Sequence, residues 1–178
     1  AFQDCTALTT LHLNAAEPPV YSGTYYATFP DKADRLYALR NRKKIILFSG
    51  SSARFGYDSE AIDRAFPDCD VVNMGVFAYT NALPQLEIIR SCTAPGDVLL
   101  HSPEFDAAQR QFCTSDNLDA PFFNMVEGNY DLLALLDLRH YGQVFTPLHS
   151  FLVSRQGMPE RPYRLSPADF DEDGNPSD

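Results

Sequence analysis

Residues 44–56 read KIILFSGSSARFG, a short apolar run that ends abruptly in small, hydroxyl-bearing residues. Such a run is typical of a buried parallel strand that delivers a loop to the carboxyl edge of an α/β sheet, where open α/β folds bind their ligands. The loop has no lysine after its glycines and lacks G-x-G-x-x-G spacing, so it matches neither a P-loop nor a dinucleotide site. It instead offers serines on a tight turn beside a helix start, where backbone N–H groups can face a developing negative charge.

The segments on either side of this strand alternate between helical and strand patterns. They predict helices over residues 31–42, 58–66 and 81–92, and two further strands over residues 70–75 and 97–101. This alternation predicts parallel strands that are joined by right-handed crossovers, with helices on both faces of the sheet. We therefore expect an α/β protein with a three-layer α/β/α architecture.

The chain divides by composition into three parts. Residues 1–30 are expected to form an irregular N-terminal arm, residues 31–156 the α/β domain, and residues 157–178 a Pro-rich and acidic tail. Within the domain, residues 128–141 predict a strong amphipathic helix and residues 145–153 a second one. The tail opens a D-x-D-x-D-G calcium-loop pattern that then fails, so a solvated acidic tail is the preferred interpretation and no metal site is expected.

The overall charge narrows the range of partners. The chain has 178 residues, 44% of them hydrophobic, with a formal net charge of −10 and a pI near 4.7. This acidity argues against nucleic acid and against an anionic membrane surface, because both attract basic patches. No apolar run approaches the roughly 18 residues that a membrane-spanning helix needs. The chain begins at Ala1, so a removed signal peptide or anchor stays open.

Cysteine usage leaves two alternatives open. The four cysteines are Cys5, Cys69, Cys92 and Cys113, and no pair has C-x-x-C spacing, so neither a zinc site nor a redox motif is expected. If the protein is exported, at least two of them are expected to form a disulfide. The other alternative is buried free thiols. No cofactor is implied by any motif in the chain.

Three motifs in order carry a resemblance to a known family. Gly50–Gly56 matches a G-D-S-x-x-x-G block with Ser51 in place of the aspartate, and Asn73-Met74-Gly75 matches an N-x-G block. The segment Pro95–Leu100 and the Pro-Glu-Phe of residues 103–105 follow them. Over residues 44–105 the chain resembles the SGNH/GDSL hydrolase superfamily, in its bacterial cell-surface branch related to polysaccharide and teichoic-acid O-acyl transfer proteins. The resemblance implies a flavodoxin-like fold of SGNH type, incomplete at its C-terminus because such a sheet usually has about five parallel strands.

The resemblance also implies a set of catalytic residues. Ser52 would be the nucleophile, and the N–H groups of Ser52 and Gly75 would stabilise the oxyanion. A histidine would act as base, oriented by an acidic residue. The D-x-x-H spacing that this requires occurs once, as Asp137 and His140, inside the predicted leucine-rich helix.

Three further residues are candidates for the neighbourhood of the serine. They are Asn73, His101 and Glu104, and Glu104 occupies the position where the family pattern supplies an asparagine donor. His101 ends the third strand and could therefore reach the same sheet edge as Ser52.

We predict a secreted or otherwise extracytoplasmic serine esterase or O-acyltransferase that acts on ester groups of a cell-surface glycan. One alternative is a non-catalytic surface or accessory domain that keeps the SGNH scaffold, and another is a carbohydrate-binding module. A histidine within hydrogen-bond reach of Ser52 would favour the enzyme.

Overall fold

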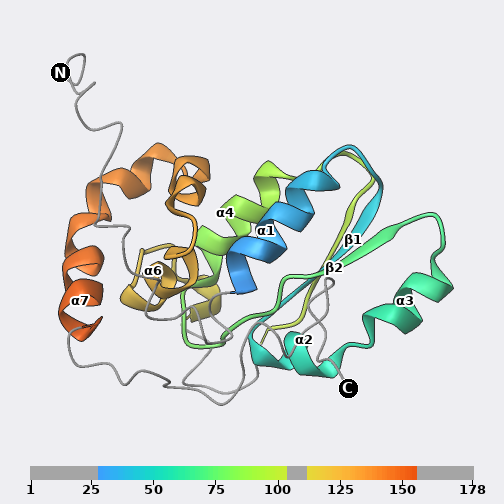
Figure 1. Cartoon of the computed structure of the whole chain (residues 1–178), viewed down its shortest axis with the longest axis horizontal. Helices are drawn as coiled ribbons and strands as arrows, with labels where there is room; N and C mark the ends of the chain where they lie inside the picture. The colour runs from blue at the N-terminus through green and yellow to red at the C-terminus, as the bar shows by residue number, and fades with distance from the viewer. Residues whose placement is uncertain (1–27, 104–111, 156–178) are drawn as a thin grey trace.

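The structure of the chain is a computed structural model that describes residues 28–103 and 112–155 (Figure 1). The acidic tail over residues 157–178 and most of the predicted arm lie outside the described residues. The last three residues of that arm belong instead to the first turn of helix α1, Thr28–Ala38. This helix therefore begins before the predicted residue 31, and Pro30 is accommodated because the first turn does not need its missing N–H.

The described residues form an α/β protein around a parallel sheet of three strands, as the alternation predicts. The strands are β1 (Lys44–Phe48), β2 (Asp70–Asn73) and β3 (Val98–His101), in the order β2-β1-β3. In the register, Ile46 lies between Val72 and Leu99. The apolar run at residues 44–48 is thus the central strand, and it is buried along its whole length.

Helices cover both faces of this sheet. Ile46 and Phe48 of β1 point to the face covered by α1 and by α4, Ala82–Ser91, and they belong to the main hydrophobic core. Ile45 and Leu47 point to the opposite face, where a smaller cluster includes Ile62 of α3, Ser59–Ala65. Both strand faces are apolar because both are covered, which is why the strand shows a continuous apolar run and no alternation.

Local capping fixes the helix boundaries near the sheet. The Asp58 carboxylate accepts a hydrogen bond from the Ala61 N–H at 2.8 Å and begins α3, as its sequence pattern predicts. Asn81 precedes α4, and Pro84 occupies its first turn. A short helix, α2 (Ser51–Gly56), follows β1 directly and carries the serines.

The prediction of one long amphipathic helix over residues 128–141 is wrong. The structure has two 3₁₀ helices, η3 (Tyr130–Leu135) and η4 (Leu138–Gln143), with extended backbone at Leu136 between them. The Asn129 and Asp137 side chains each accept an N–H from two residues further on. Such local hydrogen bonds compete with a continuous α-helix, and here they divide it.

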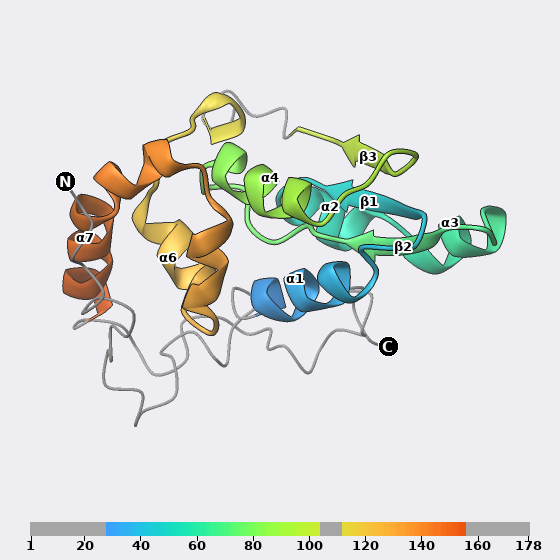
Figure 2. The same ribbon diagram turned by 90° about the horizontal axis from the view of Figure 1, so that it is seen from above.

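Two α-helices complete this helical region. They are α6 (Ala120–Val126), which the sequence patterns missed, and α7 (Phe145–Arg155), which they predicted over residues 145–153. Seen from above, this group and α3 lie at opposite ends of the molecule (Figure 2). No helix in the described part of the chain has the length and apolarity to cross a membrane.

The cysteines are free thiols wherever the structure describes them. Cys69, Cys92 and Cys113 are all unpaired, and Cys92 is buried in the main core. The alternative of free thiols therefore describes these three cysteines, Cys5 lies outside the described residues, and the disulfide expected on export stays a prediction.

Candidate functional site

Ser52 lies on the loop that follows the central strand, at the start of α2, and its side chain is exposed. Its Oγ is 3.1 Å from the Oγ of Ser49, so the two hydroxyls share a hydrogen bond in which either can donate. The strand ends at Phe48, and the turn at Gly50 leads directly into the helix. Ser52 therefore lies at a strand-to-helix turn after the central strand, and its role as the nucleophile stays a prediction.

Asn73 connects the serine loop, which we define as residues 49–56 and which includes α2, to the loop that follows β2. It is fully buried, its Nδ2 donates to the Ala53 carbonyl at 3.0 Å, and its Oδ1 accepts from the Gly75 N–H at 3.0 Å. Asn73 therefore holds the two loops side by side. In this structure the Gly75 N–H donates to Asn73. It could stabilise an oxyanion only after that hydrogen bond breaks, so its expected oxyanion role stays a prediction.

The two loops approach each other so closely that their glycines leave no room for a side chain. A Cβ placed on Gly75 would lie 2.6 Å from the Arg54 backbone nitrogen. A Cβ placed on Gly50 would lie 2.5 Å from the Ala78 Cα. Both neighbours are backbone atoms and cannot rotate away, so these glycines are required by packing between main chains.

Replacing Gly50 with alanine is expected to destabilise the protein by about 1–3 kcal/mol, because the new methyl group forces the two loops apart. Gly56→Ala is the matched control, since a Cβ at Gly56 would meet nothing within 4 Å. Urea unfolding of both variants measures the difference. Equal midpoints for the two variants would contradict the close packing described here.

A small hollow lies where the ends of the three strands meet. It is lined by Ser49 and Gly50 after β1, by Phe77 and Ala78 after β2, and by His101 at the end of β3. The His101 ring packs against Phe48, with 5.2 Å between ring centroids, and burial lowers the pKa of His101 below its ordinary value. A neutral imidazole therefore lies beside the serine loop near pH 7, in the form that can accept a proton.

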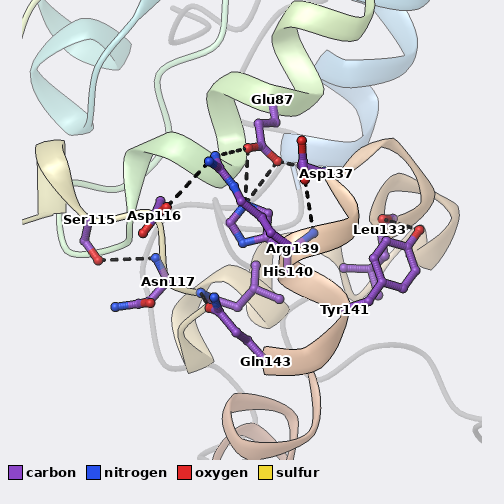
Figure 3. A network of polar contacts seen from close by, with 11 residues as sticks. Glu87, Ser115, Asp116, Asn117, Leu133, Asp137, Arg139, His140, Tyr141 and Gln143 are labelled. Carbon is purple, nitrogen blue, oxygen red and sulfur yellow. Dashed lines mark hydrogen bonds and ion pairs between the residues drawn. The ribbon is translucent and has the colours of Figure 1, made fainter.

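The predicted dyad residues Asp137 and His140 lie elsewhere (Figure 3). The fully buried His140 ring places its Nε2 3.2 Å from the Glu87 carboxylate of α4, and its Nδ1 is buried with no hydrogen-bond partner in the described structure. Asp137 begins η4 and accepts from the Arg139 N–H at 3.0 Å. Figures 1 and 2 both place α2 and this helical region apart, so the structure does not bring His140 to Ser52.

Glu87 is the centre of this second cluster. Its carboxylate accepts hydrogen bonds from the Asp137 N–H at 2.9 Å, from Arg139 Nη2 at 2.6 Å and from His140. The His140 Nε2 also lies 3.4 Å from the Arg139 Nε, and it donates to the Glu87 carboxylate in the tautomer that carries the ring proton on Nε2. Burial alone would raise the pKa of Glu87, but the hydrogen bonds from Asp137, His140 and Arg139 outweigh it and lower the pKa. The cluster ties η4 to α4 and has a structural role in the fold.

Glu87→Gln is expected to destabilise the protein near neutral pH by about 1.5–3 kcal/mol, the range for hydrogen bonds to a charged group. A carboxylate with a lowered pKa stabilises the fold above its ordinary pKa of 4.5, and this contribution is lost as the pH falls through the lowered value. Unfolding free energies measured from pH 7 to pH 3 should therefore converge for parent and variant. A constant difference across this range would contradict the charge-based role. Glu60→Gln, in the exposed pair with Arg64, is the control.

Glu104 lies outside the described residues. Within residues 28–103 and 112–155, no three or more His, Cys, Asp or Glu side chains are grouped so that they could hold a metal ion. The sequence patterns did not single out Ser49 as a site residue. Its position between the end of the apolar run and Gly50 could have indicated it.

No protein-family model, curated protein or solved structure matches this chain.

Proposed function

We propose that this protein is a serine esterase or O-acyltransferase of SGNH type that acts on ester groups of an extracytoplasmic glycan. The observation that carries the proposal is the arrangement at the carboxyl edge of the sheet. Ser52 stands exposed at a strand-to-helix turn, in hydrogen-bond contact with Ser49, and Ser49 lines the same hollow as His101. A serine nucleophile and a neutral imidazole that can act as base are two of the groups that acyl transfer to serine uses.

The reaction would proceed in two steps. The Ser52 Oγ forms a bond to the acyl carbon of the ester while its proton passes to the base, and the sugar oxygen then leaves with that proton. Water or an acceptor hydroxyl attacks the acyl-enzyme in the second step and releases Ser52. The Ser52 N–H, which the family resemblance assigns as an oxyanion donor, would stabilise the negative charge that develops on the ester oxygen.

His101 is the base that the geometry favours, in place of His140. Its imidazole lines the hollow, and its lowered pKa keeps it unprotonated at neutral pH. Because His101 must be neutral to accept the proton, the rate should fall as the pH drops through its lowered pKa. Asp137 and His140 remain the family-based assignment, but the Asp137 side chain accepts from the Arg139 N–H and the His140 ring contacts Glu87.

A serine-directed fluorophosphonate probe tests this function directly. The probe should attach covalently to Ser52 and to no other serine, because only an activated serine displaces its leaving group at a useful rate. Peptide mapping by mass spectrometry locates the adduct. Labelling of Ser52 that is lost in His101→Gln and kept in His140→Gln would support His101 as the base. An unlabelled Ser52 in the folded parent would contradict the enzyme assignment.

A second candidate function is a non-catalytic accessory domain that keeps this scaffold. The observation that favours it is the Gly75 N–H, which donates to Asn73 and so does not face a bound substrate. An absence of probe labelling together with measurable binding of an acetylated glycan would support this second candidate.

A further inference from the structure

The first turns of α1 contact both loops of the candidate site. Thr28 and Lys32 are four residues apart and therefore lie on the same face of the helix. The Thr28 Oγ1 accepts a hydrogen bond from Arg54 Nη1 at 2.9 Å, and the Lys32 Nζ donates to the Gly75 carbonyl at 2.7 Å. One contact reaches the serine loop and the other reaches the loop after β2.

These two contacts complete a closed set of hydrogen bonds. The loops are joined to each other because Asn73 donates to the Ala53 carbonyl. Each loop is also joined to α1, through Arg54 in one case and Gly75 in the other. The helix, the serine loop and the second loop therefore brace one another, although they come from separate parts of the sequence.

The Lys32 side chain is unusual because it is charged and almost completely buried. Its residue is 4% exposed, whereas an ammonium group taken out of water is costly unless strong hydrogen bonds compensate it. An apolar side chain would pack on α1 without that cost. The contact with the Gly75 carbonyl is charge-assisted, and such hydrogen bonds are about twice as strong as neutral ones.

We propose that Lys32 is a positioning residue for the serine site. Its ammonium group fixes the Gly75 peptide, and with it the close packing of the second loop against the serine loop. Thr28, on the same face of α1, supports the serine loop through Arg54. This role rests on the proposed function, since it concerns the loop that presents Ser52. The hydrogen bonds from Lys32 and Thr28 can be tested whether or not the protein is an enzyme.

The test compares Lys32→Met with Lys43→Met, which makes the same change at an exposed lysine. Hydrogen exchange at single amides is the main measurement. In Lys32→Met the Gly75 amide should exchange about 10- to 100-fold faster, the equivalent of losing one hydrogen bond to a charged group. The amides of Ile46 and Val72 in the sheet should change little. Lys43→Met should leave all of them unchanged.

If the parent hydrolyses esters, Lys32→Met should lower kcat by about 10-fold or more with KM nearly unchanged, since small misplacements of reacting groups are costly. If the parent shows no hydrolysis, the esterase proposal fails, and the exchange data still decide the role of Lys32. Unchanged exchange at Gly75, or an equal increase at Gly75 and in the sheet, would overturn the positioning role.

Thr28→Val decides the matter if Lys32→Met does not fold. It keeps the branched shape and removes only the hydroxyl that accepts from Arg54. Faster exchange confined to the amides of residues 50–56 would support the bracing role of α1. Exchange identical to that of the parent would overturn it.

Discussion

Replacing Ser52 with alanine is expected to reduce ester hydrolysis by about 10³-fold or more, because it removes the atom that forms the acyl-enzyme. p-Nitrophenyl acetate is a suitable substrate, since its leaving group needs little help from a general acid. The fold should be unaffected, because the Ser52 side chain is exposed to solvent. Circular dichroism and urea unfolding of the variant check this second expectation.

Two neighbouring substitutions make the result specific. Ser51→Ala changes the adjacent serine of the same loop and should leave the rate within a few-fold of the parent, because Ser51 is not assigned a step. His101→Gln should lower the rate strongly by removing the base, whereas His140→Gln should act mainly on stability through the Glu87 cluster. Equal activity in parent and Ser52→Ala would exclude Ser52 as the nucleophile.

The sheet and its edge were predictable because they depend on local patterns. An apolar run bounded by small residues defines β1, and a capping aspartate at Asp58 defines the start of α3. Parallel strands deliver their carboxyl ends to one edge. The turn that carries Ser52 therefore follows the strand between β2, which ends at Asn73, and β3, which ends at His101.

The hydrogen bonds within that edge were not predictable in the same way. Lys32 and Gly75 are 43 residues apart in the chain, and no periodicity marks a lysine as buried. The Gly75 N–H could serve a substrate or a neighbouring side chain, and only the coordinates show that it serves Asn73. Sequence reasoning predicted Ser52, Asn73 and His101 at one edge of the sheet, but it could not say which of their donors and acceptors are already used.

In the helical region a strong sequence pattern gave a wrong prediction, because local hydrogen bonds outweighed it. The leucines of residues 130–138 have helical spacing, but Asn129 and Asp137 bind their own backbone and divide the segment. The same division makes Asp137 the start of η4 and turns the neighbouring His140 toward Glu87. A D-x-x-H spacing that matches a catalytic motif is therefore part of a structural cluster in this fold.

Lys44 and Asp97 form a buried ion pair at the other end of the sheet. The Lys44 side chain is fully buried and that of Asp97 is 6% exposed, with 2.5 Å between Nζ and Oδ2. Asp97 also accepts from the Lys44 N–H at 3.1 Å and from the Ala94 N–H at 2.8 Å. The pair connects the start of β1 to the turn before β3. It thereby holds in the sheet the strand that carries His101.

Asp97→Asn is expected to cost about 3–5 kcal/mol of unfolding free energy at neutral pH, the usual effect of leaving one member of a buried ion pair without its partner. The asparagine keeps the shape of the side chain, so the loss reflects the uncompensated Lys44 ammonium. Asp68→Asn, at an exposed aspartate, should change stability by less than about 0.5 kcal/mol. Urea unfolding at pH 7 measures both variants.

The double variant Lys44→Met with Asp97→Asn separates the charge from the packing. Removing both charges should restore much of the stability that Asp97→Asn alone loses, because no buried ammonium then remains without a partner. The pH dependence gives an independent check. Burial favours a raised pKa for Asp97, but its hydrogen bonds and the Lys44 charge outweigh burial and hold the pKa below its ordinary 3.8. The stabilisation is therefore complete above that ordinary value and is lost as the pH falls through the lowered one, so parent and Asp97→Asn should converge in strongly acidic solution. A double variant no more stable than Asp97→Asn would show that shape, and not charge, holds β3 against β1.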